Sequence, residues 1–215
     1  MSAVAGWRVE RRQGSAGELH VLGWPAPLEP TVWLLDWRRP ALVLGSTQRP
    51  DSVDLVALET EGVELVQRRS GGGAVFLEPG SSVWIDLFIP RDEPRWDDDV
   101  TRSFFWVGEA WVGALAELGL AAEVHRGGLV RTEQSDRVCF AGLGPGEVTV
   151  GGIKAVGLSQ RRTRAGARFQ CVVYRSWDPT LLGAIAGVVP DELPPVATVA
   201  STSAAVEAAF LRHLA

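Results

Sequence analysis

The chain contains one lysine, Lys154, beside 20 arginines. A lysine ammonium is a compact point charge on a flexible stem, whereas an arginine guanidinium is a planar fork that stays charged. A site that needs one cation aimed at a single oxygen atom therefore favours lysine. The alternative is that Lys154 is an ordinary solvated residue on a turn.

Lys154 follows the turn of a predicted β-hairpin. The alternating segment 147–150 leads into Gly151-Gly152, and a two-residue Gly-Gly connection allows the positive φ angles of a tight turn. On the returning strand, the period of two predicts that Lys154 shares a face with Val156 and Leu158. We therefore expect Lys154 on a mostly apolar strand face rather than in a run of charges.

Two segments are rich in glycine. Residues 142–146 contain too much glycine for a regular element, and we expect the backbone near Gly144 and Gly146 to approach a ligand closely. The other segment reads Arg68-Arg69-Ser70-Gly71-Gly72-Gly73. Consecutive N–H groups without Cβ atoms can form a concave nest for an anion, and neighbouring arginines add contacts to phosphate or carboxylate. The glycine spacing fits neither a P-loop nor a dinucleotide-binding fingerprint, so a plain glycine-rich turn is the alternative.

Two motifs together resemble the lipoate–protein ligase A family, with its octanoyltransferase relatives and the biotin ligase catalytic domain. They are RRSGGGAVF at 68–76 and EVTVGGIKAVGLSQRR at 147–162. The resemblance covers roughly residues 35–175. It implies an α+β fold, a mixed and mainly antiparallel sheet flanked by helices. It also implies a tunnel for an acyl chain and an adenylate or thioester head group, between the glycine-rich segment and the lysine strand.

The resemblance assigns roles to individual residues. Lys154 matches the lysine that lies at the reacting carbonyl, where a cation stabilises the negative charge of acyl transfer. The residues that match the substrate- or adenylate-binding positions are Arg68, Arg69, Ser70, Gly71, Gly72, Gly73, Ala74, Val75, Gly157 and Ser159. No residue is assigned as a metal ligand.

The chain departs from the family pattern at two histidine positions, which Leu77 and Gln170 occupy. We expect none of the three histidines of the chain to act as a general base; they are His20, His125 and His213. An incoming substrate lysine would then lose its proton to water or to Asp86.

Two chemical routes remain open. A ligase activates lipoate or octanoate with ATP and Mg²⁺ and transfers the acyl group from the adenylate. A transferase takes an octanoyl group from acyl carrier protein onto a cysteine and passes it on. Cys139 resembles that cysteine in position, although most cysteines are small buried hydrophobes, as we expect for Cys171. A non-catalytic protein that binds an acyl or adenylate ligand is a third reading, and biotin ligation is a further alternative within the fold.

Length and composition are compatible with these readings. The 215 residues fit one catalytic domain, with a core at about 31–175, closing helices at about 180–214 and no accessory domain. A net charge of −5 gives no support for nucleic-acid binding. Without a signal-peptide pattern or a long apolar run, we expect a cytoplasmic protein with free thiols and no membrane partner. The expected partners are lipoyl carrier domains, of the 2-oxoacid dehydrogenase E2 or glycine cleavage H type, and acyl carrier protein.

The sequence pattern also predicts where the regular elements lie. We expect strands at 31–36, 41–45, 63–67, 82–89 and 168–174. We expect helices over 52–61, with Ser52 as the N-cap, and over about 104–118, 180–189 and 203–214. The first 30 residues read as an irregular, proline-stiffened entry, and residues 121–137 carry no clear pattern.

Overall fold

The computed structural model describes residues 2–4 and 6–214 and contains two β-sheets. The large sheet has, in spatial order, β1 (Ser2–Val4), β2 (Trp7–Gly14), β3 (Thr31–Trp37), β7 (Ser82–Pro90), β11 (Gly166–Tyr174), β10 (Ile153–Arg162), β9 (Val148–Val150) and β8 (Ala122–Val124). The small sheet has β5 (Glu64–Gln67), β4 (Ala41–Leu44) and β6 (Val75–Leu77). Among the strand pairs of the described residues, only β2/β3 and β4/β5 are parallel, so the predicted mixed, mainly antiparallel sheet is confirmed.

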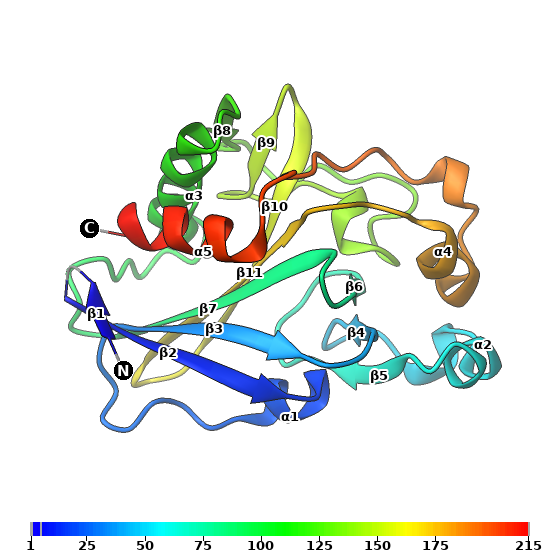
Figure 1. The fold of residues 1–215 in the computed structure, drawn as a ribbon, viewed down its shortest axis with the longest axis horizontal. Helices are drawn as coiled ribbons and strands as arrows, with labels where there is room; N and C mark the ends of the chain where they lie inside the picture. The colour runs from blue at the N-terminus through cyan, green and yellow to red at the C-terminus, as the bar shows by residue number, and fades with distance from the viewer. Residues whose placement is uncertain (1, 5, 215) are drawn as a thin grey trace.

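The helices and sheets form layers (Figure 1). Helices α3 (Phe105–Glu117) and α5 (Ser203–Arg212) cover one face of the large sheet, where Trp111 stacks on Phe210 with ring centroids 4.2 Å apart. The opposite face packs on the small sheet and on α1 (Ala16–Val21). Helices α2 (Leu55–Thr60) and α4 (Thr180–Ala186) cover the far face of the small sheet.

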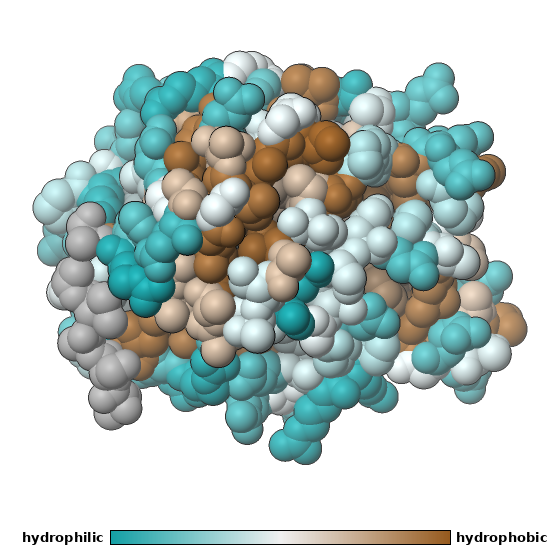
Figure 2. All heavy atoms as spheres, turned by 45° about the horizontal axis from the view of Figure 1, so that its top comes forward, coloured by the Kyte–Doolittle hydropathy of each residue, from teal (hydrophilic) through white to brown (hydrophobic). Residues whose placement is uncertain are grey.

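Each pair of layers encloses its own apolar cluster, because the strands of the large sheet bury side chains on both faces. β7 is the clearest case, since eight of its nine residues are buried. The cluster between the two sheets contains α1 residues together with Trp33, Trp84 and Phe140. On the surface, apolar side chains gather in a band across the face shown in Figure 2, with hydrophilic side chains around it. No helix among residues 2–4 and 6–214 is long and apolar enough to cross a membrane.

The predicted strands and the four predicted helices are present, with ends shifted by a few residues. One of these element predictions was wrong, and another was right for only part of its range. Asp54, rather than Ser52, caps α2, because its carboxylate accepts hydrogen bonds of 2.9 Å from the N–H groups of Val56 and Ala57. The proline-stiffened, irregular entry is present only at residues 22–30, since β1, β2 and α1 lie before it within residues 2–21. α1 is anchored from outside by Glu64, whose carboxylate accepts from the N–H groups of Ala16 and Gly17.

Candidate active site

A β-bulge in β10 aims Lys154. Lys154 lies opposite Thr149 of β9, but Val156 lies opposite Val148, so β10 carries one extra residue at Ala155. Adjacent residues of β9 face opposite sides, and Lys154 and Val156 therefore do so too. The prediction that Lys154 shares a face with Val156 and Leu158 was wrong for this reason. Val156 packs beneath α3, whereas Lys154 lies on the opposite side of the sheet.

The Lys154 ammonium is buried and has three acceptors. Its Nζ lies 3.0 Å from the carbonyl oxygen of Cys139, 2.9 Å from that of Gly142 and 2.6 Å from Oε2 of Glu147. The Phe140 ring centroid lies 4.9 Å from Nζ and adds a cation–π contact. The side chain is only 5% exposed, so the solvated-turn alternative does not apply. An ammonium group has three N–H donors, and here each has a protein acceptor.

Glu147 organises the backbone around Lys154. Its Oε2 also accepts from the N–H of Gly144 at 2.7 Å, and its Oε1 accepts from the N–H of Leu158 at 3.0 Å. The carboxylate therefore ties the glycine-rich loop 142–146 to β10. We did not predict this role, because Glu147 looked like the polar start of an alternating strand. A lone acidic residue inside an otherwise uncharged, glycine-rich stretch was the only available signal.

Arg68 lies beneath the glycine-rich loop rather than on its open side. Arg68 is 5% exposed, and its guanidinium donates to the carbonyl oxygens of Val43 at 3.1 Å, Gly71 at 2.7 Å and Gly73 at 2.8 Å. Its charge therefore holds the loop backbone in shape. Among the hydrogen bonds of residues 2–4 and 6–214, no protein group accepts from the N–H groups of Gly71–Gly73. Those N–H groups can serve as the predicted anion nest.

The loop is joined to the Cys139 segment and to β10. The Cys139 N–H donates to the carbonyl oxygen of Ala74 at 2.9 Å. A Cβ atom at Gly73 would lie 2.7 Å from the Val138 carbonyl carbon, so only glycine permits this approach. The hydroxyl of Ser70 donates to that of Ser159 at 3.0 Å. The structure thus brings the predicted segment 70–74 together with Cys139 and Ser159.

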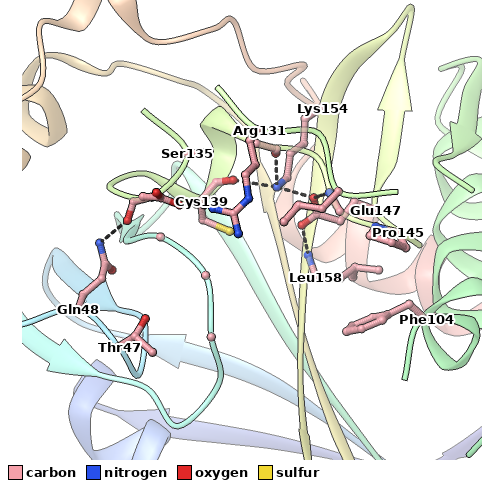
Figure 3. A pocket seen from close by; sticks show the side chains of 17 residues that line it. Thr47, Gln48, Phe104, Arg131, Ser135, Cys139, Pro145, Glu147, Lys154 and Leu158 are labelled. Atoms are coloured by element: carbon pink, nitrogen blue, oxygen red, sulfur yellow. Dashed lines mark hydrogen bonds and ion pairs between the residues drawn. The ribbon is translucent and has the colours of Figure 1, made fainter. Parts of the chain in front are cut away.

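Cys139 lies at the junction of two cavities. The outer cavity has a volume of about 540 Å³, and Gly71–Gly73, Arg131 and Lys154 line it together with Cys139 (Figure 3). The inner cavity, of about 30 Å³, also contains Cys139 in its wall. The thiol is half-buried. Because it faces both spaces, Cys139 can contact a head group in the outer cavity and an acyl chain in the inner one.

The inner cavity lies between the two sheets and has a largely apolar wall. Val75 of β6, Gly157 of β10 and Val172 of β11 contribute to it. Leu77 and Gln170, which replace the two histidines of the family pattern, line the same cavity. A volume of about 30 Å³ is close to the share of one water molecule in the liquid, so an acyl chain would have to displace the surrounding side chains.

Three expectations about individual residues change. Gly146 has a packing reason to be glycine, because a Cβ there would lie 2.2 Å from that of Phe104, the residue before α3. Arg69 is exposed, in contrast to the buried Arg68. Asp86 is fully buried, accepts from Trp84 Nε1 at 2.8 Å and pairs with Arg168. An incoming lysine therefore cannot reach Asp86 directly.

The predicted resemblance agrees with a family model described as the lipoyl protein ligase A/B catalytic domain, which matches residues 22–208. The chain belongs to this family. Among curated relatives, the octanoyltransferase LipM of Moorella thermoacetica is 31% identical over 137 residues, which is 62% of this chain and 49% of that protein. LipM of Carboxydothermus hydrogenoformans is 30% identical over 134 residues, with 62% and 48% covered. The chain thus spans about half the length of the curated relatives it matches.

Solved structures of lipoate–protein ligases share the fold. A lipoate–protein ligase A bound with ATP aligns with a TM-score of 0.74 at 19% identity, over 98% of this chain and 84% of that chain. The bipartite ligase of Thermoplasma acidophilum, studied with its E2 lipoyl domain, aligns with a TM-score of 0.73 at 19% identity, over 97% and 82%. The predicted fold of the lipoyl protein ligase A/B family is therefore confirmed.

Proposed function

We propose that the protein transfers a lipoyl or octanoyl group to a lysine of a lipoyl carrier domain, with Cys139 as the transient acyl carrier. The observation that carries this proposal is the position of Cys139, half-buried where the outer and inner cavities meet. The names of the LipM relatives support octanoyl transfer, and the E2 lipoyl domain studied with the Thermoplasma acidophilum ligase supports the class of acceptor.

In the first step, the Cys139 thiolate attacks the carbonyl carbon of an acyl thioester, such as octanoyl-acyl carrier protein. A bond forms from Sγ to that carbon, and the donor thiolate leaves and takes up a proton. In the second step, the amine of the carrier lysine attacks the Cys139 thioester, forms the amide and loses a proton, while the Cys139 thiolate leaves. Lys154 would stabilise the negative oxygen in both steps after exchanging one backbone acceptor for the substrate oxygen.

ATP-dependent ligation is the second candidate, because the outer cavity is far larger than a thioester carbonyl needs. Its volume of about 540 Å³ falls in the range of small-molecule sites. The unpaired N–H groups of Gly71–Gly73 would hold the phosphate of an adenylate there. In the part of the chain that the structure describes, no group of three or more His, Cys, Asp or Glu side chains could hold a metal. Mg²⁺ would therefore be coordinated mainly by phosphate oxygens of the nucleotide.

Intact-mass measurement of an apo lipoyl domain separates the routes. One reaction contains lipoate and Mg-ATP, and the other contains octanoyl-acyl carrier protein without ATP. We expect a mass shift in the second reaction and an octanoyl adduct on the enzyme that is absent in Cys139→Ala. A shift in the first reaction only, retained by Cys139→Ala, would replace the cysteine route by the ligase. No shift in either reaction would contradict acyl transfer by this chain and favour a ligand-binding role.

A further inference from the structure

His20 presents an unpartnered N–H group to the inner cavity. The side chain comes from the last turn of α1 and lines this cavity together with Cys139 and Gln170. Among the described residues, no protein atom forms a hydrogen bond with His20 Nε2, although this atom is buried. A buried polar atom without a protein partner needs another partner, and because His20 lines the inner cavity, a molecule in that cavity can supply it.

The surroundings of His20 fix its tautomer and its position. Gln170 Nε2 lies 3.4 Å from His20 Nδ1, so Nδ1 accepts and Nε2 carries the proton. The imidazole stacks on Trp84 with ring centroids 4.5 Å apart. Arg168 donates to the backbone carbonyl of Leu19 at 3.2 Å and to that of His20 at 3.4 Å, which anchors the end of α1. His20 is therefore a preorganised, neutral donor.

The sheet register places His20 at the end of the cavity away from Cys139. Gly157 of β10, which lies against Phe140, pairs with Val172 of β11, and Val172 pairs with Trp84 of β7. Two strand spacings, or about 10 Å, therefore separate Gly157 from Trp84, on which His20 stacks. An extended chain of eight carbons covers this distance. With the acyl carbonyl at Cys139, the tail of the chain would reach His20.

We propose that His20 determines acyl specificity: its Nε2–H favours an acyl chain whose tail carries a hydrogen-bond acceptor, as the sulfurs of a lipoyl group do, over a plain octanoyl chain. This inference rests on the proposed acyl transfer. A sulfur atom is a weak acceptor but still satisfies the N–H, whereas an alkyl tail covers the donor and leaves it unpaired. The same donor would favour a hydroxyl at the tail more strongly.

The test measures binding, which does not depend on turnover. Calorimetry would give the dissociation constants of lipoic, octanoic and 8-hydroxyoctanoic acid for the wild type, H20F, H20Q and the control H213F. His213 ends α5 beside Glu117, away from the cavity. We expect the wild type to bind 8-hydroxyoctanoic acid about tenfold more tightly than octanoic acid, and lipoic acid by a smaller factor in the same direction. H20F should abolish this preference, H20Q should keep part of it through its amide donor, and H213F should leave it unchanged.

Each outcome decides the matter. An equal preference in the wild type and H20F, or no binding of any of the acids by the wild type, would overturn the proposal. If H20F fails to fold by circular dichroism, the comparison of H20Q with the wild type decides, since H20Q must then show a reduced but measurable preference. Acyl transfer to an apo lipoyl domain is assayed separately. Its absence, alongside a His20-dependent binding preference, would contradict the proposed function and leave the role of His20 standing.

Discussion

Replacing Glu147 by glutamine tests the buried ion pair that holds Lys154. The two side chains are 6% and 5% exposed, and Oε2 lies 2.6 Å from Nζ. Oε2 accepts from both the Lys154 ammonium and the Gly144 N–H, while Oε1 accepts from Leu158. In either amide orientation, the glutamine NH₂ group faces another donor. Because the ammonium stays buried without its counter-ion, we expect the free energy of unfolding to fall by about 3–5 kcal/mol.

The assay is urea unfolding followed by fluorescence, for which the nine tryptophans of the chain are suited. Glu109→Gln is the matched control, since Glu109 forms an ion pair with Arg126 in which both side chains are more than half exposed. Exposed ion pairs contribute little to the free energy of unfolding, so the control should unfold at nearly the same urea concentration as the wild type. Glu147→Gln unfolding at the same urea concentration as the control would refute the reasoning.

A double variant identifies which lost interaction lowers the stability of Glu147→Gln. Lys154→Met combined with Glu147→Gln removes both charges while keeping similar volumes. Uncharged replacements of buried ion pairs are often neutral, so the double variant should be more stable than Glu147→Gln alone. If it is equally unstable, the lost backbone contacts of Glu147, rather than the stranded ammonium, account for the effect.

Three further predictions follow from the site. Lys154→Arg should lower the rate of acyl transfer at least about 100-fold, because the planar arginine guanidinium cannot replace the lysine ammonium among these acceptors. Mass spectrometry of the carrier domain measures the rate, and wild-type turnover would contradict the role of Lys154. Gly73→Ala should cost about 1–3 kcal/mol in urea unfolding, because the Cβ would meet the Val138 backbone at 2.7 Å, whereas Gly71→Ala, with nothing within 4 Å of its Cβ, should be tolerated. Burial and the charges of Arg168 and Arg68 lower the pKa of His20 from 6.5 to about 3. Neutral His20 therefore contributes stability that is fully present above pH 6.5 and is lost at about 1.4 kcal/mol per unit as the pH falls toward 3. H20Q should remove this part of the pH dependence of unfolding. An unchanged dependence of the unfolding free energy on pH would show that His20 does not cause it.

Much of the framework was predictable because it depends on local patterns. The Gly151-Gly152 turn, the alternation of β7 and the apolar face of α3 each follow from backbone geometry and periodicity. The anion nest at 71–73 was predicted from residue types that limit what the backbone can do, and it stays a prediction. These features need no knowledge of distant contacts.

The features that were missed depend on distant contacts. α1 has only six residues, too few for a helical period, and Glu64 anchors its start from 48 residues away. His20, which α1 carries into the inner cavity, was therefore set aside. The aim of Lys154 depends on a bulge that is defined by pairing with β9, and a strand pattern cannot reveal it. The partnership of Glu147 with Lys154 likewise emerges only when the hairpin closes.

The bulge at Ala155 also sets which lengths of β10 the fold tolerates. Deleting this one residue would leave Lys154 opposite Thr149 and Val156 opposite Val148, so every side chain of the strand would keep its face. Deleting Gly157 instead would shift each later residue by one position and turn the face of β10 over against β11. A chain without Ala155 would therefore keep the register of the sheet and lose the local twist together with one buried methyl group. The side of the sheet on which the ammonium lies is thus set by the pairing, whereas the angle at which it points is set by the bulge.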